Sequence, residues 1–402
     1  MITSSHQSRI LFISTFPPSK CGIASFTEDL LNAITPAINN DFVINICALG
    51  NQELSNNFKY PVTMVMDAHQ LASCIDTAQL INNDSSIELV SVEHEFGLFG
   101  GELGEYLLGF LSMLEKPFII RFHTVLPDPD SKRLQVVRAI AMLAEKIIVM
   151  TGNSSRLLTE DYQIDSDKIT IIPHGTHART GLSEAELKIA NDLENKLVLT
   201  TFGLLSPNKG IEKGILAMKD ICARIPEAIY IVIGQTHPNL LLQEGEEYRN
   251  YLQQIIDDNN LQQNIRLINE YVPTKKLMEY LALTDIYLFT SKDPDQAVSG
   301  TFLYAMSAGC AIISNAFILA KEMLDEKTGI ILQTNEVNEL AEYAIGLLQN
   351  KNARTQMGIR AFIKTRNSNW KNVAEKHIEL FNKTLARPIK PAKTFTILSV
   401  NQ

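Results

Sequence analysis

Short apolar segments rich in β-branched residues alternate with helical patterns along nearly the whole chain. In the first half, strands are expected at 10–15, 42–49, 87–92, 117–123, 146–150 and 168–174. In the second half, a strand is expected to open the stretch 197–210, and further strands are expected at 228–234, 264–269, 285–290, 310–315 and 329–333. Such alternation is typical of parallel sheets with helices on both faces. A polar helical stretch at 183–195 separates the two series, so the sequence predicts an α/β protein with two Rossmann-like, doubly wound parallel-sheet domains.

The stretch from Asp293 to Gly309, DPDQAVSGTFLYAMSAG, has the features of a ligand site. It follows a buried-strand pattern, and Ser299, Gly300 and Thr301 then open a helix that Gly309 is placed to end. The N–H groups at a helix start are unpaired and lie at the positive end of the helix dipole, where phosphate binds well. An ordinary strand-to-helix turn capped by Thr301 explains the same residues, so both interpretations stay open.

Two other strand-to-helix turns have features of an anion site. Gly22 precedes an amphipathic helix, but its loop lacks G-x-G-x-x-G, which argues against a dinucleotide fingerprint. Lys209 lies just before a helix of the second series, where its ammonium can reach a phosphate at the helix start. A plain turn and a solvated surface lysine are the alternatives at these two positions.

Polar side chains end two strands of the first series, at EHE (93–95) and RFHT (121–124). The carboxyl ends of parallel strands share one edge of the sheet, where ligands of such sheets bind. His94 and His123 therefore indicate a binding site at this edge, although a lone buried histidine is more often structural. Their spacing differs from that of zinc ligands, so no metal is expected.

Composition argues against several other classes of protein. The chain has 402 residues, of which 45% are hydrophobic and 20% charged, as in soluble globular proteins of two domains. Its net charge of −9 argues against a nucleic-acid partner. The first residues lack the apolar core of a signal peptide, and no apolar run approaches the roughly 20 residues of a membrane-spanning helix. Five scattered cysteines without a C-x-x-C pair indicate reduced thiols, so a cytoplasmic location is expected.

Taken together, these segments resemble a known family. The chain is similar over nearly its whole length to GT-B glycosyltransferases of the retaining family 4 type. The matching segments are FPPSKCGIASFTEDL, HEFGLFGGELG, FHTVLPDP, IIPHG, FGLLSPNKG, EYVPTKKLMEYLALTDIYL and DQAVSGTFLYAMSAG. The resemblance implies an acceptor-side domain at 1–180, a facing donor-binding domain at 181–368, and a C-terminal helix and tail at 369–402 that cross back to the first domain.

The resemblance also implies roles for individual residues. Gly22 would lie against the donor's phosphate or sugar, and His123 would reach a hydroxyl of the donor sugar. Lys209 would pair with the diphosphate, and backbone groups near Val272 would contact the base. The amides at 299–301 would hold the distal phosphate. In this family the leaving phosphate is thought to act as the base, so the resemblance implies neither a protein nucleophile nor a metal.

Three positions depart from the family pattern. Leu204 stands where the family has a phosphate-binding arginine. Gln296 and Tyr304 stand where the family has two glutamates, which face the transferred sugar and the nucleotide ribose. A glutamine can still hydrogen-bond sugar hydroxyls, and a tyrosine can still meet a ribose. We therefore interpret the chain as a divergent member that keeps the activity.

The expected function is transfer of a sugar from a UDP- or GDP-linked donor to a hydroxyl of a glycan or glycoconjugate, with retention of configuration. The candidate catalytic residues are His123, Lys209 and Gln296. The candidate donor-binding residues are Gly22, His94, Leu204, Val272, Ser299, Gly300, Thr301 and Tyr304. The nucleotide sugar is a substrate, and no cofactor is expected. Two alternatives stay open, a sugar phosphorylase and a non-catalytic sugar- or nucleotide-binding subunit, as do peripheral membrane contact and the oligomeric state.

Overall fold

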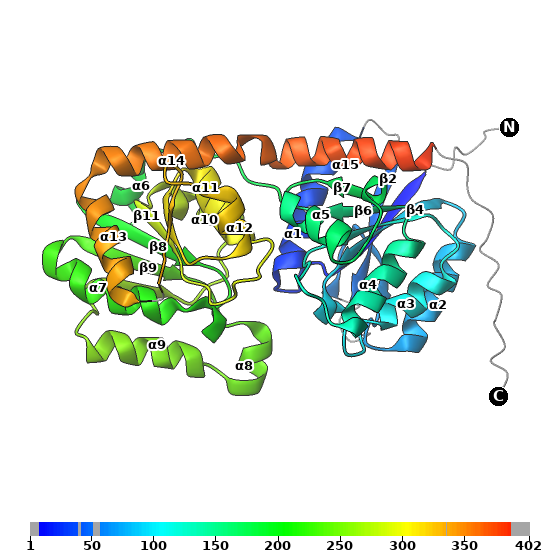
Figure 1. The fold of residues 1–402 in the computed structure, drawn as a ribbon, viewed down its shortest axis with the longest axis horizontal. Coiled ribbons are helices and arrows are strands. Elements are labelled where there is room, and N and C mark those ends of the chain that lie inside the picture. Colours follow the sequence, from blue (N-terminus) through cyan, green and yellow to red (C-terminus); the bar gives the residue numbers. More distant parts are fainter. Residues whose placement is uncertain (1–7, 39–41, 51–56, 335, 387–402) are drawn as a thin grey trace.

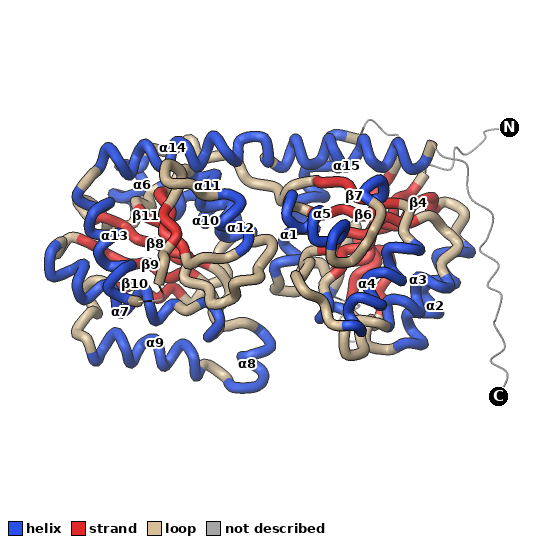
Figure 2. The backbone as a smooth tube through the Cα atoms, in the orientation of Figure 1, coloured by secondary structure: helices blue, strands red, loops and turns tan. Residues whose placement is uncertain are grey.

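The chain forms two α/β units that lie side by side, with two long helices running along one edge of both (Figure 1). The structure is a computed structural model, and it describes residues 8–38, 42–50, 57–334 and 336–386. Figure 2 shows that the strands form two separate sheets with helices packed around each. The predicted fold class is therefore confirmed, while the tail expected from residue 387 onward lies outside the described residues.

The first sheet has seven parallel strands in the order β3-β2-β1-β4-β5-β6-β7. Its strands are β1 (Arg9–Ser14), β2 (Val43–Leu49), β3 (Val62–Met66), β4 (Ile87–His94), β5 (Phe118–Phe122), β6 (Lys146–Val149) and β7 (Ile169–Ile171). Its helices are α1 (Gly22–Ile34), α2 (Leu71–Asn83), α3 (Tyr106–Met113), α4 (Ser131–Leu143) and α5 (Gly152–Glu160). The order reverses between β1 and β4, and such a switch point opens a crevice at the carboxyl ends of the strands.

The second sheet has six parallel strands in the order β10-β9-β8-β11-β12-β13. Its strands are β8 (Leu197–Phe202), β9 (Ala228–Ile233), β10 (Ile265–Ile268), β11 (Ile286–Phe289), β12 (Ala311–Ser314) and β13 (Ile330–Ile331). The helices of this half are α6 (Glu184–Ala190), α7 (Ile211–Arg224), α8 (Pro238–Glu244), α9 (Glu247–Asp258), α10 (Thr274–Ala282), α11 (Gly300–Ala308), α12 (Ile318–Met323), α13 (Val337–Gln349) and α14 (Lys351–Thr365). The reversal here falls between β8 and β11, which places a second crevice beside α11.

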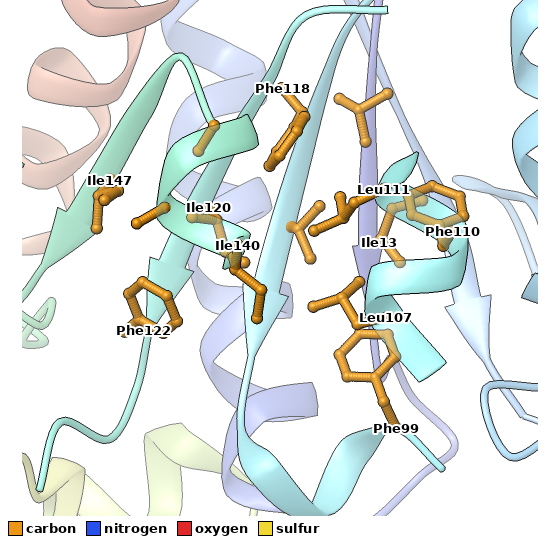
Figure 3. Packing of buried hydrophobic residues seen from close by; sticks show 14 of the residues in the cluster. Ile13, Phe99, Leu107, Phe110, Leu111, Phe118, Ile120, Phe122, Ile140 and Ile147 are labelled. Carbon is orange, nitrogen blue, oxygen red and sulfur yellow. The ribbon is translucent and has the colours of Figure 1, made fainter. Parts of the chain in front are cut away.

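Burial on both faces of each sheet explains the continuous apolar runs of the central strands. All five residues of β5, FIIRF, are buried, and so are all six of β9, AIYIVI. Figure 3 shows Ile120 of β5 beside Ile140 of α4, and Phe110 and Leu111 of α3 beside Ile13 of β1, all in the first core. Full burial of a side chain of this kind contributes roughly 1.5–3 kcal/mol, so these layers fix the strand ends that position the site.

The last helix, α15 (Trp370–Leu385), crosses back and packs on the first unit. Its Trp370, Val373 and Phe381 share one core cluster with Phe12 of β1 and Phe26 of α1. The predicted crossover is therefore confirmed.

The chain passes between the units twice, and the two passages are hydrogen-bonded to each other. The Thr176 amide donates to the Ser368 carbonyl at 2.8 Å, and the Trp370 amide donates to the Thr176 carbonyl at 3.0 Å. The two crossings therefore act as one connection between the units.

The twelve expected strands are all present, and the sequence patterns missed one. β3 (Val62–Met66) lies at the edge of the first sheet and has only one fully buried residue, so its sequence lacks a strong apolar run. The polar helix expected at 183–195 is shorter, because α6 ends at Ala190.

Candidate active site

A pocket lies at the carboxyl ends of β8 and β11, beside the first turn of α11. It is lined by Thr201, Phe202, Gly203, Leu204, Leu205, Lys209, Ile211, Tyr287, Phe289, Thr290, Ser291 and Thr301. The structure thus brings together three predicted site residues, Leu204, Lys209 and Thr301. Lys209 is the only charged residue of this lining, so the pocket suits a ligand group with negative charge.

The first turn of α11 forms where it was expected, with a different cap. Ser299 has extended backbone, and its Oγ accepts a hydrogen bond from the Phe302 amide at 3.3 Å. Ser299 rather than Thr301 is therefore the N-cap, and Gly309 ends the helix at a left-handed φ of 83°. The amides of Gly300 and Thr301 precede the first intrahelical hydrogen bonds, which leaves them available to an anion.

Gly300 lies directly against His174, which follows β7 of the first unit. A β-carbon at Gly300 would lie 3.0 Å from His174 Nε2, so a larger residue here would require the His174 ring to shift. Burial lowers the pKa of His174 to about 4, and its Nδ1 donates to the Gly175 carbonyl at 2.7 Å. The neutral ring therefore presents Nε2 as an acceptor toward the start of α11.

Lys209 ends the short 3-10 helix η5 (Pro207–Lys209), just before α7. The turn requires Gly210, which has a φ of 60° and whose β-carbon would collide with the Thr290 carbonyl. Burial lowers the pKa of Lys209, and the charge of Asp293 partly offsets this. Within the described part of the chain, the Lys209 ammonium has no hydrogen bond or ion pair. A partly buried cation of this kind is stabilised when an anion binds beside it.

The loop between β10 and α10 lies near the first unit. Val272 is partly buried and packs on the core, while the preceding Tyr271 is 44% exposed. The Tyr271 hydroxyl is hydrogen-bonded to Ser25 Oγ on α1. This loop of the second unit therefore contacts α1 of the first unit.

His123 lies at the end of β5 and pairs with Glu93 at the end of β4. Its Nε2 is 2.7 Å from Glu93 Oε2, and the ring keeps 11% exposure while the carboxylate keeps 1%. Desolvation raises the pKa of Glu93, but the charge of Arg121 and the hydrogen bond from His123 outweigh it and lower the pKa. The ionised carboxylate accepts from Nε2–H, so Nδ1 is the His123 nitrogen left for a ligand.

His94 is placed differently from His123, although both end strands of the same sheet. It is fully buried, at 0% exposure, and its ring contacts Phe96, Phe99 and Phe122. Desolvation lowers its pKa to about 3, and neither ring nitrogen has a hydrogen-bond partner among the described residues. The structure therefore does not bring His94 to the surface that carries His123.

Gly22 is the first residue of α1, and the space around it is open. A β-carbon built at Gly22 meets no atom within 4 Å, so nothing in the fold of the described residues requires a glycine here. Its neighbour Lys20 donates to Gln235 Oε1 of the second unit at 3.1 Å. The Gly22 loop thus faces the end of β9, across the space between the two units.

Gln296 and Tyr304 have different surroundings. Gln296 Nε2 donates to the Val298 carbonyl at 3.0 Å, which directs its other amide atom, Oε1, away from that bond. The Tyr304 hydroxyl donates to Asp29 Oδ2 on α1 at 2.9 Å. Burial and the Asp29 carboxylate raise the pKa of Tyr304 well above its ordinary range, so the phenol stays a donor.

Phe26 of α1 connects the two halves of the site. Its ring centroid is 5.0 Å from that of His123 and 5.1 Å from that of His174, with edge-to-face geometry in both pairs. His174 in turn contacts Gly300. The exposed face of His123 and the start of α11 therefore belong to one site between the units.

Several residues of this site were assigned no individual role from the sequence. Asp29, His174 and the Glu93 carboxylate are the clearest cases. Glu93 could have been found, because it lies next to Arg121 in the parallel register of β4 and β5. Asp29 and His174 make their contacts to α11 across the interface, and no local pattern signals such a contact.

The described residues contain neither a cluster of metal ligands nor a membrane-spanning helix. No group of three or more His, Cys, Asp or Glu side chains in this part of the chain could hold a metal ion. Within the same residues, no helix has both the length and the apolar character to cross a membrane.

The second half of the chain matches a known family model. Residues 183–363 match the glycosyl transferases group 1 family, and this range contains the pocket and α11. An uncharacterized glycosyltransferase of Methanocaldococcus jannaschii is 27% identical over 244 residues, which cover 60% of this chain and 59% of that protein. The chain spans about half to three fifths of the length of the curated relatives that it matches.

Solved structures share the fold over almost the whole chain. The Anabaena protein HepE in complex with UDP and glucose has a TM-score of 0.72 at 15% identity, and the match covers 94% of this chain and 100% of that one. A sucrose-phosphate synthase from Thermosynechococcus elongatus has a TM-score of 0.74 at 16% identity, covering 94% and 99%. The two facing sheets of this chain are therefore a GT-B fold.

Proposed function

We propose that this chain, which carries a glycosyl transferases group 1 domain on a GT-B fold, transfers a sugar from a nucleoside-diphosphate sugar to an acceptor hydroxyl. The main support is the pocket that Lys209 lines together with Thr301 of the first turn of α11, where the first amides of the helix precede its intrahelical hydrogen bonds. The bound UDP of the Anabaena protein supports a nucleotide-linked donor. A UDP- or GDP-linked sugar and a glycan or glycoconjugate acceptor fit this proposal.

In the proposed reaction, the donor diphosphate lies between Lys209 and the amides of Gly300 and Thr301. The bond from C1 of the sugar to the diphosphate breaks, and the acceptor oxygen bonds to C1 from the same face. A diphosphate oxygen takes the acceptor proton, and bond formation on the face that the diphosphate leaves retains the anomeric configuration. Charge develops on the leaving diphosphate, and stabilisation of such charge by preorganised donors is usually the largest catalytic contribution. These groups carry that charge without a metal ion.

The remaining candidate residues bind the donor in this proposal. His123 Nδ1 and Gln296 Oε1 hydrogen-bond hydroxyls of the transferred sugar. Gly22 leaves room for the sugar or phosphate, and the loop at Val272 contacts the base. Leu204 supplies an apolar wall, so Lys209 provides the only side-chain positive charge in the pocket lining.

A donor screen tests the proposal. UDP, GDP and their common sugar conjugates are added singly, and the melting temperature is measured, because a ligand that binds only the folded form raises it. Donors that stabilise the protein are then incubated with glycan acceptors, and NMR of the product reads the anomeric configuration. We expect a nucleotide sugar to stabilise the protein and to give a retained product.

Two other outcomes identify the alternatives. Sugar transfer that needs inorganic phosphate and no nucleotide would assign a phosphorylase. Nucleotide or glycan binding without transfer or donor hydrolysis would assign a binding subunit. Absence of any nucleotide effect on the melting temperature would contradict the proposal itself.

A further inference from the structure

A chain of buried polar side chains runs from the site to the last helix. His123 Nε2 lies 2.7 Å from Glu93 Oε2, and Glu93 Oε2 lies 3.1 Å from Arg121 Nε. Arg121 Nη2 is hydrogen-bonded to Nε2 of His377 on α15. Glu93, Arg121 and His377 are each at most 1% exposed. This hydrogen-bonded series of side chains therefore joins β4, β5 and α15, and only its His123 end is open to the site.

The donor and acceptor roles along this chain are fixed. Nδ1 of His377 donates to the Val373 carbonyl at 2.7 Å, and desolvation lowers the pKa of His377 to about 3. The ring is neutral, so its Nε2 is an acceptor and Arg121 is the donor. Arg121 also donates to the Glu93 carboxylate, and His123 contacts Oε2 of the same carboxylate.

The same argument sets the tautomer of His123. Glu93 is ionised beside Arg121 and can only accept, so His123 donates through Nε2–H. Its Nδ1 then carries a lone pair and accepts from a ligand. A sugar hydroxyl can donate to such a nitrogen. If the tautomer were reversed, Nδ1–H would be a donor, and the sugar hydroxyl would have to accept instead of donate.

We propose that Glu93, Arg121 and His377 are positioning residues that hold His123 with Nδ1 as the hydrogen-bond acceptor for a hydroxyl of the transferred sugar. This inference rests on the proposed function. It has a structural consequence as well, because His377 lies on α15. Docking of α15 on the first unit therefore completes the donor site, although the helix does not touch the pocket.

The packing around Arg121 supports a positioning role. Its guanidinium carbon lies 4.8 Å from the centre of the Phe26 ring, and the same ring contacts His123 edge-to-face. Phe26 thus contacts both the Arg121 guanidinium and the His123 ring. Burying an ion pair costs free energy that an apolar core does not, so stability alone gives a weak reason for this arrangement.

The tautomer can be measured directly. In protein labelled with ¹⁵N-histidine, long-range ¹H–¹⁵N NMR should show His123 protonated at Nε2 in the wild type. Glu93→Gln offers an amide whose oxygen is drawn to Arg121 and whose NH₂ faces His123, so the proton should move to Nδ1. A wild-type His123 protonated at Nδ1 would overturn the inference, whatever the enzyme turns over.

Kinetics test the consequence for the donor. Glu93→Gln should lower kcat/KM for the nucleotide sugar on the order of 10²-fold, because a misdirected contact at the sugar misplaces the reacting carbon. Its dissociation constant for the free nucleotide should stay unchanged, since the nucleotide does not reach His123. If kcat/KM for the nucleotide sugar and the affinity for the free nucleotide fell by the same factor, the fold would be generally damaged and the inference would be contradicted.

A matched pair on α15 tests the coupling. His377→Gln keeps an acceptor near the place of Nε2, whereas His377→Leu removes it and leaves a donor of Arg121 unpaired. We expect His377→Leu to lower kcat/KM roughly 10-fold or more and His377→Gln to recover most of it. Thr384→Val, which removes a buried hydroxyl elsewhere on α15, is the control for lost stability.

The outcomes separate this inference from the proposed function. If no nucleotide sugar is turned over by the wild type, the proposed function fails, and the NMR tautomer still tests the geometry. If the wild type transfers sugar and His377→Leu behaves like Thr384→Val, the positioning role is wrong while the function stands. If Glu93→Gln does not fold, the His377 pair and the wild-type tautomer decide.

Discussion

The Tyr304 hydroxyl of α11 donates a hydrogen bond to Asp29 Oδ2 of α1 at 2.9 Å, which joins the two units beside the site. Nε2 of His177 lies 2.9 Å from the same carboxylate oxygen. Tyr304 follows the helix start that faces the pocket by one turn. A contact between the units therefore lies directly next to the proposed diphosphate site, so closure and donor binding share the same helix.

Tyr304→Phe should loosen this contact without disturbing either core. One hydrogen bond contributes about 1 kcal/mol, and the substitution leaves Asp29 paired with His177. We expect a fall of about 1 kcal/mol in the free energy of unfolding, and a larger radius of gyration by small-angle scattering without ligand. Tyr343→Phe, at an exposed site on α13, is the control and should change neither quantity. An unchanged radius and stability in Tyr304→Phe would show that the contact does not hold the units together.

Lys209→Met should lower activity without lowering stability. The ammonium is the only side-chain cation of the pocket lining, so its loss should lower kcat/KM on the order of 10²–10³-fold. Burial lowers the Lys209 pKa in the folded state, so the folded chain binds this proton less well than the unfolded chain. The charge thus costs stability at neutral pH, and the substitution should raise the melting temperature or leave it unchanged.

The matched control is Lys275→Ala, an exposed lysine on α10 of the same unit. It should leave kcat/KM unchanged. Loss of transfer in both variants, or native folding of Lys209→Met with full transfer, would contradict the assignment of Lys209.

Three buried histidines should make the folded state sensitive to mild acid. Burial lowers the pKa of His94 and His377 to about 3 and that of His174 to about 4, whereas an unfolded histidine has a pKa near about 6.5. As the pH falls below about 6.5, the unfolded chain takes up protons that the folded chain does not, so stability falls. Each such proton lowers the free energy of unfolding by about 1.4 kcal/mol per pH unit, and the three together lower it by about 4 kcal/mol per pH unit.

Urea unfolding at a series of pH values between about 7.5 and 4.5 measures this slope. His94→Leu should reduce the slope by one proton and should raise stability at neutral pH, because it replaces a buried ring whose nitrogens have no partner among the described residues. If His94→Leu left the dependence of the free energy of unfolding on pH unchanged, His94 would not be a buried neutral histidine.

Local signals predicted the parts of the site that lie within one turn of the chain. Ser299 and Gly309 were expected at the two ends of α11, and both are there. Lys209 was expected just before a helix, and α7 begins two residues later. Such positions follow from capping preferences and backbone geometry, which depend on neighbouring residues alone.

Contacts between distant segments could not be predicted in the same way. Glu93 and His123 are 30 residues apart, and Asp29 and Tyr304 are 275 apart. The first contact depends on the order of β4 and β5 in the sheet, and the second on how the two units meet. His94 shows the limit most clearly, because a strand end leaves open whether its last side chain points into the core or toward a ligand.

Gly22→Ala should raise stability while it weakens donor binding. A β-carbon at Gly22 meets no atom of the described residues, and alanine at the start of α1 restricts the unfolded chain, which stabilises by about 0.4–1 kcal/mol. If the open space belongs to the donor, the same methyl group should raise KM for the nucleotide sugar and its dissociation constant. Gly346→Ala is the matched control, since Gly346 also has nothing within 4 Å but lies on α13. Both variants should therefore gain stability in thermal unfolding, and only Gly22→Ala should lose affinity in calorimetric titration. Equal affinity in the two variants would place the donor away from α1.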